Sequence, residues 1–197
     1  MKSYILILLL LAFSLSGSEA ATELWSVNTF RFSTKDTLKM DLIPELRFKD
    51  QGLYYFQIYF GPAFQMNKNW GINLYYAQNL SKTNSNWSTY GLGYLDFICQ
   101  FPPFSNRGRF EYNIPSDLLK YRDLLQIKWN NWNLGGEVFY NTKLDCWDES
   151  RWSIGRSFGL SKSAELNIAY LKRQQRKNVN AQWGDTEVLN VGIKMNL

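Results

Sequence analysis

The carboxylates Glu111 and Glu137 are the first residues that suggest catalysis, because a pair of carboxylates can do acid–base chemistry on a glycosidic bond. Nothing in the sequence sets the separation between them that this chemistry requires. Histidine is absent from all 197 residues, which excludes Ser-His and Cys-His nucleophile pairs and His-ligated metals. We therefore predict that the protein is not an enzyme and uses no cofactor.

A second group of acidic residues, Asp145, Asp148 and Glu149, has the oxygen ligands that calcium prefers. Their spacing matches no calcium-binding loop, so we interpret them as part of a solvated loop and predict no metal site. Cys99 and Cys146 could form a disulfide or remain two isolated thiols, because the sequence does not fix the distance between them.

A basic run at residues 172–177 carries four positive charges and is expected on an outer loop. Phosphate groups of lipopolysaccharide would be natural partners for these charges, although a merely solvated loop explains them equally well. The aromatic residues that alternate with basic ones in nucleic-acid binders are missing, so no nucleic-acid partner is expected. The four side chains are Lys172, Arg173, Arg176 and Lys177.

Residues 1–20 are predicted to be a cleaved signal peptide. Lys2 supplies a positive n-region, residues 4–15 are almost wholly apolar, and Ala20 provides a small residue at the cleavage position. The apolar run of about 12 residues is shorter than the roughly 20 that a spanning helix needs. The domain plan is therefore a signal peptide at 1–20 and one envelope domain at 21–197.

Apolar and polar residues alternate with period two through most of this domain, which is typical of β-strands with two different faces. In residues 38–48 every even position is apolar, whereas the odd positions include Lys39, Glu45 and Arg47. The alternation and a Gly-rich segment predict about eleven strands. They are residues 25–32, 38–48, 54–66, 70–78, 90–99, 107–114, 120–129, 132–141, 151–160, 164–171 and 189–197.

The connections between these strands alternate in length. Hairpin-short connections are expected at 67–69, 130–131 and 161–163, and longer loops at 79–86, 142–150 and 172–185. One rim of turns and one rim of loops is the arrangement of an antiparallel meander closed on itself. The sequence thus predicts an all-β fold, a closed antiparallel up-and-down transmembrane β-barrel of 10 to 12 strands. Because bacterial single-chain barrels have even strand counts, we expect either 10 or 12 strands.

Alternation alone does not decide whether the apolar face looks inward, as in a lipocalin-like carrier, or outward at lipid. Tryptophans near strand ends favour the outward orientation, since membrane barrels carry aromatic girdles at both interfaces. The predicted girdle is Trp25, Trp70, Trp87, Trp129, Trp132 and Trp152. The opposite face carries both charge signs and is expected to form a packed charge network in a narrow lumen, or the lining of an anion-favouring pore. Its predicted members are Lys39, Glu45, Arg47, Arg107, Arg109, Glu111, Arg122, Lys128, Glu137 and Arg151.

Several spaced residues carry a resemblance to a known family. They are Trp25, Glu45-Leu46-Arg47-Phe48, Arg107, Arg109 and Glu111 on one strand, Tyr121-Arg122, Glu137, Phe139, Arg151, Gly155, Tyr170 and Gln174. With these residues the chain resembles the outer-membrane β-barrel proteins known as domain of unknown function 2490. The resemblance implies a location in the outer membrane of a Gram-negative bacterium and brings no established activity with it.

The sequence therefore favours an outer-membrane barrel that serves as an envelope component or as a narrow solute channel. Its expected partners are outer-membrane lipid, lipopolysaccharide and, during biogenesis, the barrel-assembly machinery. The alternative is a soluble periplasmic or secreted β-barrel that binds an apolar ligand inside. A third hypothesis is a carbohydrate-binding sandwich that uses tryptophans in loops, such as Trp147 and Trp183.

Overall fold

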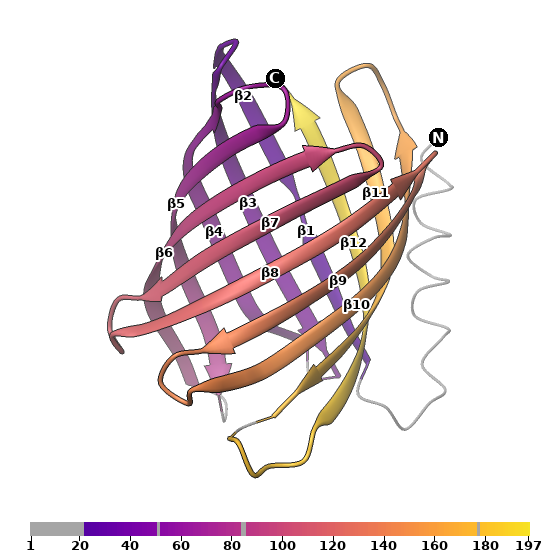
Figure 1. Ribbon diagram of the computed structural model, residues 1–197. Coiled ribbons are helices and arrows are strands. Elements are labelled where there is room, and N and C mark those ends of the chain that lie inside the picture. The colour runs from indigo at the N-terminus through magenta and orange to yellow at the C-terminus, as the bar shows by residue number, and fades with distance from the viewer. Residues whose placement is uncertain (1–21, 51, 84–85, 177) are drawn as a thin grey trace.

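The structure is a computed structural model that describes residues 22–50, 52–83, 86–176 and 178–197, so the predicted signal peptide at 1–20 lies outside the described residues. These residues form an all-β barrel in which the strands wind obliquely around a common axis (Figure 1). The described part of the chain contains no helix that is long and apolar enough to cross a membrane.

Twelve strands make up the sheet in the described residues, and consecutive strands are hydrogen-bonded neighbours from β2 to β12. Their bounds are β1 (Thr22–Val27), β2 (Thr29–Lys35), β3 (Leu38–Lys49), β4 (Gly52–Gln65), β5 (Trp70–Thr83), β6 (Asn86–Phe101), β7 (Phe104–Asn113), β8 (Leu118–Trp129), β9 (Trp132–Asn141), β10 (Cys146–Gly159), β11 (Ala164–Gln175) and β12 (Gly184–Asn196).

Strands β1 and β2 are two halves of a single position in the barrel. Both are antiparallel to β3 and parallel to β12, so together they close the ring between the last strand and the third. The described sheet is therefore a closed barrel with eleven strand positions. The closed barrel and the eleven strands expected from the alternation are both confirmed.

The expected even strand number is wrong, and the fully antiparallel arrangement fails at one place. In a meander with an odd number of positions, the first and last strands run in the same direction, so the pair that closes the barrel must be parallel. The register places Leu24 beside Leu189 and Thr29 beside Lys194. As a consequence, β1 begins at one rim and β12 ends at the other.

The parallel seam, where β1 and β2 pair with β12, is interrupted at Asn28, which separates β1 from β2. The Asn28 side chain replaces a missing backbone acceptor, because its Oδ1 accepts a hydrogen bond of 3.0 Å from the backbone N–H of Ile193. Gly192 lies against the backbone at the same point, where a Cβ would be 2.0 Å from the carbonyl oxygen of Val27. Only glycine allows β12 to approach the interrupted strand this closely.

The two rims differ less than the sequence suggested. The turn rim is the end of the barrel that carries the connections 36–37, 66–69, 102–103, 130–131 and 160–163, and the loop rim is the opposite end. The longer loops predicted at 79–86 and 142–150 are wrong in extent, because β5 continues to Thr83 and β10 already begins at Cys146. Polar residues at the end of β5 still pair with β6, and this pairing continues as far as Thr83 and Asn86.

Two irregularities change which side chains face inward. Leu53 and Tyr55 pair with consecutive residues of β3, so Tyr54 is an extra residue and its hydroxyl reaches the interior carboxylate of Glu23 at 2.6 Å. A second register shift between Trp147 and Glu149 makes Asp148 and Glu149 consecutive buried residues. Such bulges re-aim side chains without ending a strand.

The seam generates the first prediction. Gly192→Ala should lower the free energy of unfolding of the refolded barrel by about 1–3 kcal/mol or more, because the added methyl group overlaps a backbone oxygen that cannot move independently. Urea titration of the refolded protein measures the change.

Gly93→Ala is the matched control, since a Cβ at Gly93 would meet no atom within 4 Å. Equal unfolding midpoints for the two variants would contradict the close approach at the parallel seam.

Candidate functional site

The interior of the barrel contains buried charged side chains from many strands. Thirteen buried polar or charged residues outnumber the eleven buried hydrophobic ones in the described part of the chain. Five interior arginines, defined here as the arginine cluster, come from β3, β7, β8 and β10: Arg47, Arg107, Arg109, Arg122 and Arg151.

Glu137 of β9 is the shared partner of three members of this cluster. Its carboxylate lies 3.2 Å from Arg107 Nη2, 3.0 Å from Arg122 Nη2 and 3.3 Å from Arg151 Nη1. Only 7% of Glu137 is exposed, so these charges interact in surroundings that screen them weakly. A single carboxylate therefore balances part of the charge of three guanidinium groups.

The other arginines have carboxylate partners of their own. Arg109 donates two hydrogen bonds to Asp96, at 2.5 and 2.7 Å, in the two-pronged geometry that makes such pairs strong. Arg47 lies 2.6 Å from Glu45. Arg122 also reaches Glu111 at 3.4 Å, and Arg151 also reaches Glu149 at 2.6 Å.

Aromatic rings pack against the guanidinium groups. Arg47 lies 4.0 Å from the ring centre of Trp25 and 4.3 Å from that of Tyr55. Arg122 and Arg151 both lie over the ring of Phe139, 4.5 and 4.3 Å from its centre. Such cation–π contacts fix the arginines where water is scarce.

One wall of the interior is built from tyrosines on β4 to β6. Tyr59, Tyr75 and Tyr94 pack with Ala77 and Leu92 in a buried cluster. The hydroxyl of Tyr75 donates to Asp41 at 2.7 Å, and that of Tyr59 donates to Glu45 at 3.2 Å. The rings fill the lumen while their hydroxyl groups join the charge network.

Eight of the ten residues expected in the lumen take part in ion pairs inside the barrel, which form three separate groups. They are Glu45, Arg47, Arg107, Arg109, Glu111, Arg122, Glu137 and Arg151. The other two, Lys39 and Lys128, lie outside these groups. Lys128 lines a cavity at the turn rim, and Lys39 lies on β3 next to the turn at 36–37.

Further interior charges were not predicted. Asp41 and Asp96 are each 1% exposed, and Arg31 pairs with Asp41 at 2.6 Å. Their parity within each strand could have identified them, because Asp41 shares the face of Lys39 and Glu45. Asp148 and Glu149 could not be found in this way, since the bulge places two consecutive residues inside. Glu149 binds Arg173 at 2.9 Å, and Asp148 binds Lys120 at 3.1 Å.

A cavity of about 470 Å³ occupies the part of the lumen that reaches the turn rim. The arginine cluster and Glu137 form its floor, and small or polar residues such as Gly135, Ser153 and Asn190 line its walls. Lys128, Glu165 and Lys194 surround its mouth. Toward the loop rim the interior is filled instead, with Gln57, Asn79 and Val188 each less than 2% exposed.

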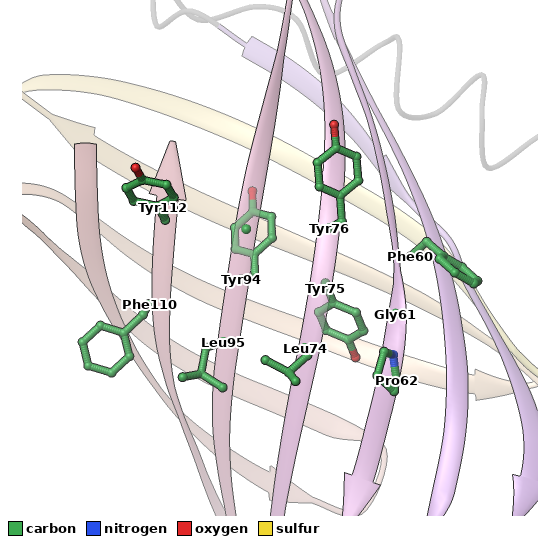
Figure 2. A pocket seen from close by; sticks show the side chains of 11 residues that line it. Phe60, Gly61, Pro62, Leu74, Tyr75, Tyr76, Tyr94, Leu95, Phe110 and Tyr112 are labelled. Carbon is green, nitrogen blue, oxygen red and sulfur yellow. The ribbon is translucent and has the colours of Figure 1, made fainter. Parts of the chain in front are cut away.

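The outer face of the barrel is apolar. Thirty large hydrophobic side chains are exposed among the described residues, most of them at outward positions of the strands. An open hollow of about 530 Å³ on this face is lined by Phe60, Leu74, Leu95 and Phe110 (Figure 2). It coincides with Pro62 of β4, where the ladder between β4 and β5 is interrupted.

The tryptophan girdle needs one correction. Trp25 is 3% exposed and lies inside the barrel, where its indole N–H donates to Glu23 at 2.9 Å. It occupies an inward position within β1, because this strand begins at Thr22 and Trp25 does not lie at its end.

The other five predicted tryptophans and the two loop candidates are exposed on the outside. Near the turn rim lie Trp70, Trp129 and Trp132, and near the loop rim lie Trp87, Trp147 and Trp183, with Trp152 farther along β10.

The remaining candidates are separated by the fold. Cys99 and Cys146 are free thiols, because Cys99 lies near the turn rim on β6 and Cys146 begins β10 at the loop rim; the disulfide alternative is therefore wrong. Tyr140 donates a hydrogen bond to Asp145, while Asp148 and Glu149 bind basic partners, and the described residues contain no metal-binding cluster.

The basic run does not form one exposed patch. Lys172 and Arg173 belong to β11 and therefore point to opposite faces, with Arg173 inside on Glu149 and Lys172 paired with Asp185 at 2.9 Å. Arg176 donates to backbone carbonyls of Trp147 and Val179. Lys177 lies outside the described residues.

Neither a protein-family model nor a curated protein sequence matches this chain.

The shared carboxylate gives the second prediction. Glu137→Gln removes the negative charge that three arginines share and leaves them buried, so the free energy of unfolding should fall by about 3–5 kcal/mol. Denaturant titration of the refolded barrel checks this loss.

Asp185→Asn is the matched control, because its ion pair with Lys172 is well exposed and should leave the unfolding midpoint unchanged. The same unfolding midpoint for Glu137→Gln and the unaltered protein would show that Glu137 does not hold the interior together.

Proposed function

We propose that the protein is an outer-membrane β-barrel of a Gram-negative envelope, similar to the family of domain of unknown function 2490, whose lumen is closed by its own charged side chains. The observation that carries this proposal is the reversed polarity of the barrel. Charged residues such as Glu137 and Arg109 are buried in its interior, and thirty large hydrophobic side chains are exposed among the described residues. Soluble monomers rarely expose so much contiguous apolar surface.

The backbone arrangement suits a bilayer for a separate reason. Inside a membrane every N–H and C=O must be paired within the protein, and a closed sheet without edges meets this requirement. The exposed tryptophans near both rims occupy the positions of interfacial aromatic belts. Pairs such as Trp70 with Phe101 and Tyr140 with Trp147 extend these belts.

In this proposal the turn rim faces the periplasm and the loop rim faces outward, as in other outer-membrane barrels. Lipid contacts the apolar face, and the barrel-assembly machinery inserts the protein. Lys172 and Arg176 are the remaining candidates for lipopolysaccharide phosphate, because Arg173 is engaged inside the barrel. The odd strand number departs from the bacterial rule, although odd-numbered membrane barrels exist in mitochondria.

The soluble carrier of an apolar ligand is less well supported. Such a carrier needs an apolar interior, whereas the interior cavity here has a floor of arginines and Glu137. The outer hollow lined by Leu74 and Leu95 is open rather than enclosed. An apolar ligand would therefore bind to the outer surface of the barrel, which contacts lipid tails in our proposal.

The lipid-facing surface gives the third prediction. Leu125 is 51% exposed on the outer face near the middle of β8. In a bilayer Leu125→Lys should reduce the free energy of unfolding by about 2–4 kcal/mol, as expected for a cation near the midplane. The measurement is urea unfolding of the protein refolded into lipid vesicles.

Val179→Lys serves as the control, because Val179 is equally exposed but lies in the connection between β11 and β12 and should tolerate a charge. A Leu125→Lys variant as stable as the control would mean that this face contacts water, and the membrane proposal would fail.

A narrow solute channel is the second candidate, favoured by the cavity that reaches the turn rim. The packed residues Gln57, Asn79 and Val188 argue that the lumen is closed toward the loop rim. We therefore expect no steady current steps from the refolded protein in planar lipid bilayers. Reproducible ion-selective steps would contradict the closed lumen and identify the protein as a channel.

A further inference from the structure

The interior cavity has an unbalanced charge at its surface. Its floor is the arginine cluster, and Lys128 and Lys194 add two cations at the mouth. The carboxylates that line it are Glu45, Glu137 and Glu165, whereas Asp96, Glu111 and Glu149 bind the arginines away from the lining. Among the residues that line the cavity, cations therefore outnumber the three carboxylates.

Arg107 is the member of the cluster that is available to a ligand. Its side chain is 30% exposed, compared with 6–15% for the other four arginines. Its ion-pair partner is Glu137, which Arg122 and Arg151 also use. The exposed part of the Arg107 side chain therefore has access to the cavity, whereas its Nε, like that of Arg122, is buried without a partner among the described residues.

The cavity also has the size and the lining of a small-molecule site. Its volume of about 470 Å³ lies within the range of roughly 300–1,000 Å³ that is usual for ligand pockets. Ser153, Asn167 and Asn190 on its walls offer neutral hydrogen-bonding groups.

We propose that this cavity is a binding site for a small anion whose carboxylate or phosphate group is held by Arg107. Lys128 and Lys194 attract the anion at the turn rim. This inference goes beyond the proposed function, because the site belongs to the interior of the barrel and does not depend on the membrane around it.

Isothermal titration calorimetry on the full chain, folded in detergent at low ionic strength, tests the site with succinate and inorganic phosphate as separate probes. We expect saturable binding of at least one probe, and the probe that binds distinguishes a carboxylate from a phosphate ligand. Arg107→Gln should weaken this binding at least about tenfold, because it removes a charge-assisted hydrogen bond. Lys194→Gln should weaken it by a smaller factor.

The matched control removes a cation at the same rim that lies outside the cavity. Arg156 itself borders the cavity, so the control is made at Lys162 instead, as Lys162→Gln: Lys162 is an exposed cation in the connection between β10 and β11 on the same rim and is not among the residues that line the cavity. This variant should bind the probe as the unaltered protein does. If Arg107→Gln does not fold, the double variant Lys128→Gln and Lys194→Gln takes its place and should also weaken binding. The site is overturned if neither probe binds saturably, or if the variants of the lining bind as tightly as the control.

Discussion

Closure of the sheet is the constraint on which the rest of this structure depends. Eleven strand positions leave no free edge only because the interrupted strand made of β1 and β2 pairs in parallel with β12. That pairing needs Gly192 for the close approach and the Asn28 side chain as a substitute acceptor. Once the ring is closed, the period-two alternation of each strand assigns its side chains to the inside or the outside, except at the bulges.

Ionic interactions, rather than a continuous hydrophobic core, hold the interior of the barrel together. Removing an arginine from water is costly, and this cost is recovered only where carboxylates and aromatic faces are in place. Glu137 pairs with three guanidinium groups at once, and Phe139, two residues along β9, packs against two of them. Because three arginines share this one carboxylate, Arg107 keeps an Nε that is unpaired among the described residues and lies beside a cavity. The ion pairs that stabilise the barrel therefore also leave a cation that can bind a ligand.

Period-two alternation was enough to predict the strands, the closed barrel and most of the interior charge network, because side-chain parity is a local property of a strand. What it missed depends on pairing between strands. The bulge before Glu149 and the inward position of Trp25 follow from register, which neighbouring strands set. The even strand number was inferred from a general rule about bacterial barrels, and the single position shared by β1 and β2 overrides it. The disulfide alternative failed because Cys99 and Cys146 lie at opposite rims.

In our proposal this charge-filled barrel lies in a membrane with its apolar face toward lipid. The most direct measurement is to wash membranes of expressing cells with alkaline carbonate and to run the outer-membrane pellet on a detergent gel with and without boiling. We expect the protein to stay in the pellet and its mobility to change on boiling, because a closed barrel resists detergent until it is heated. Release into the soluble fraction without a mobility shift would contradict the proposal.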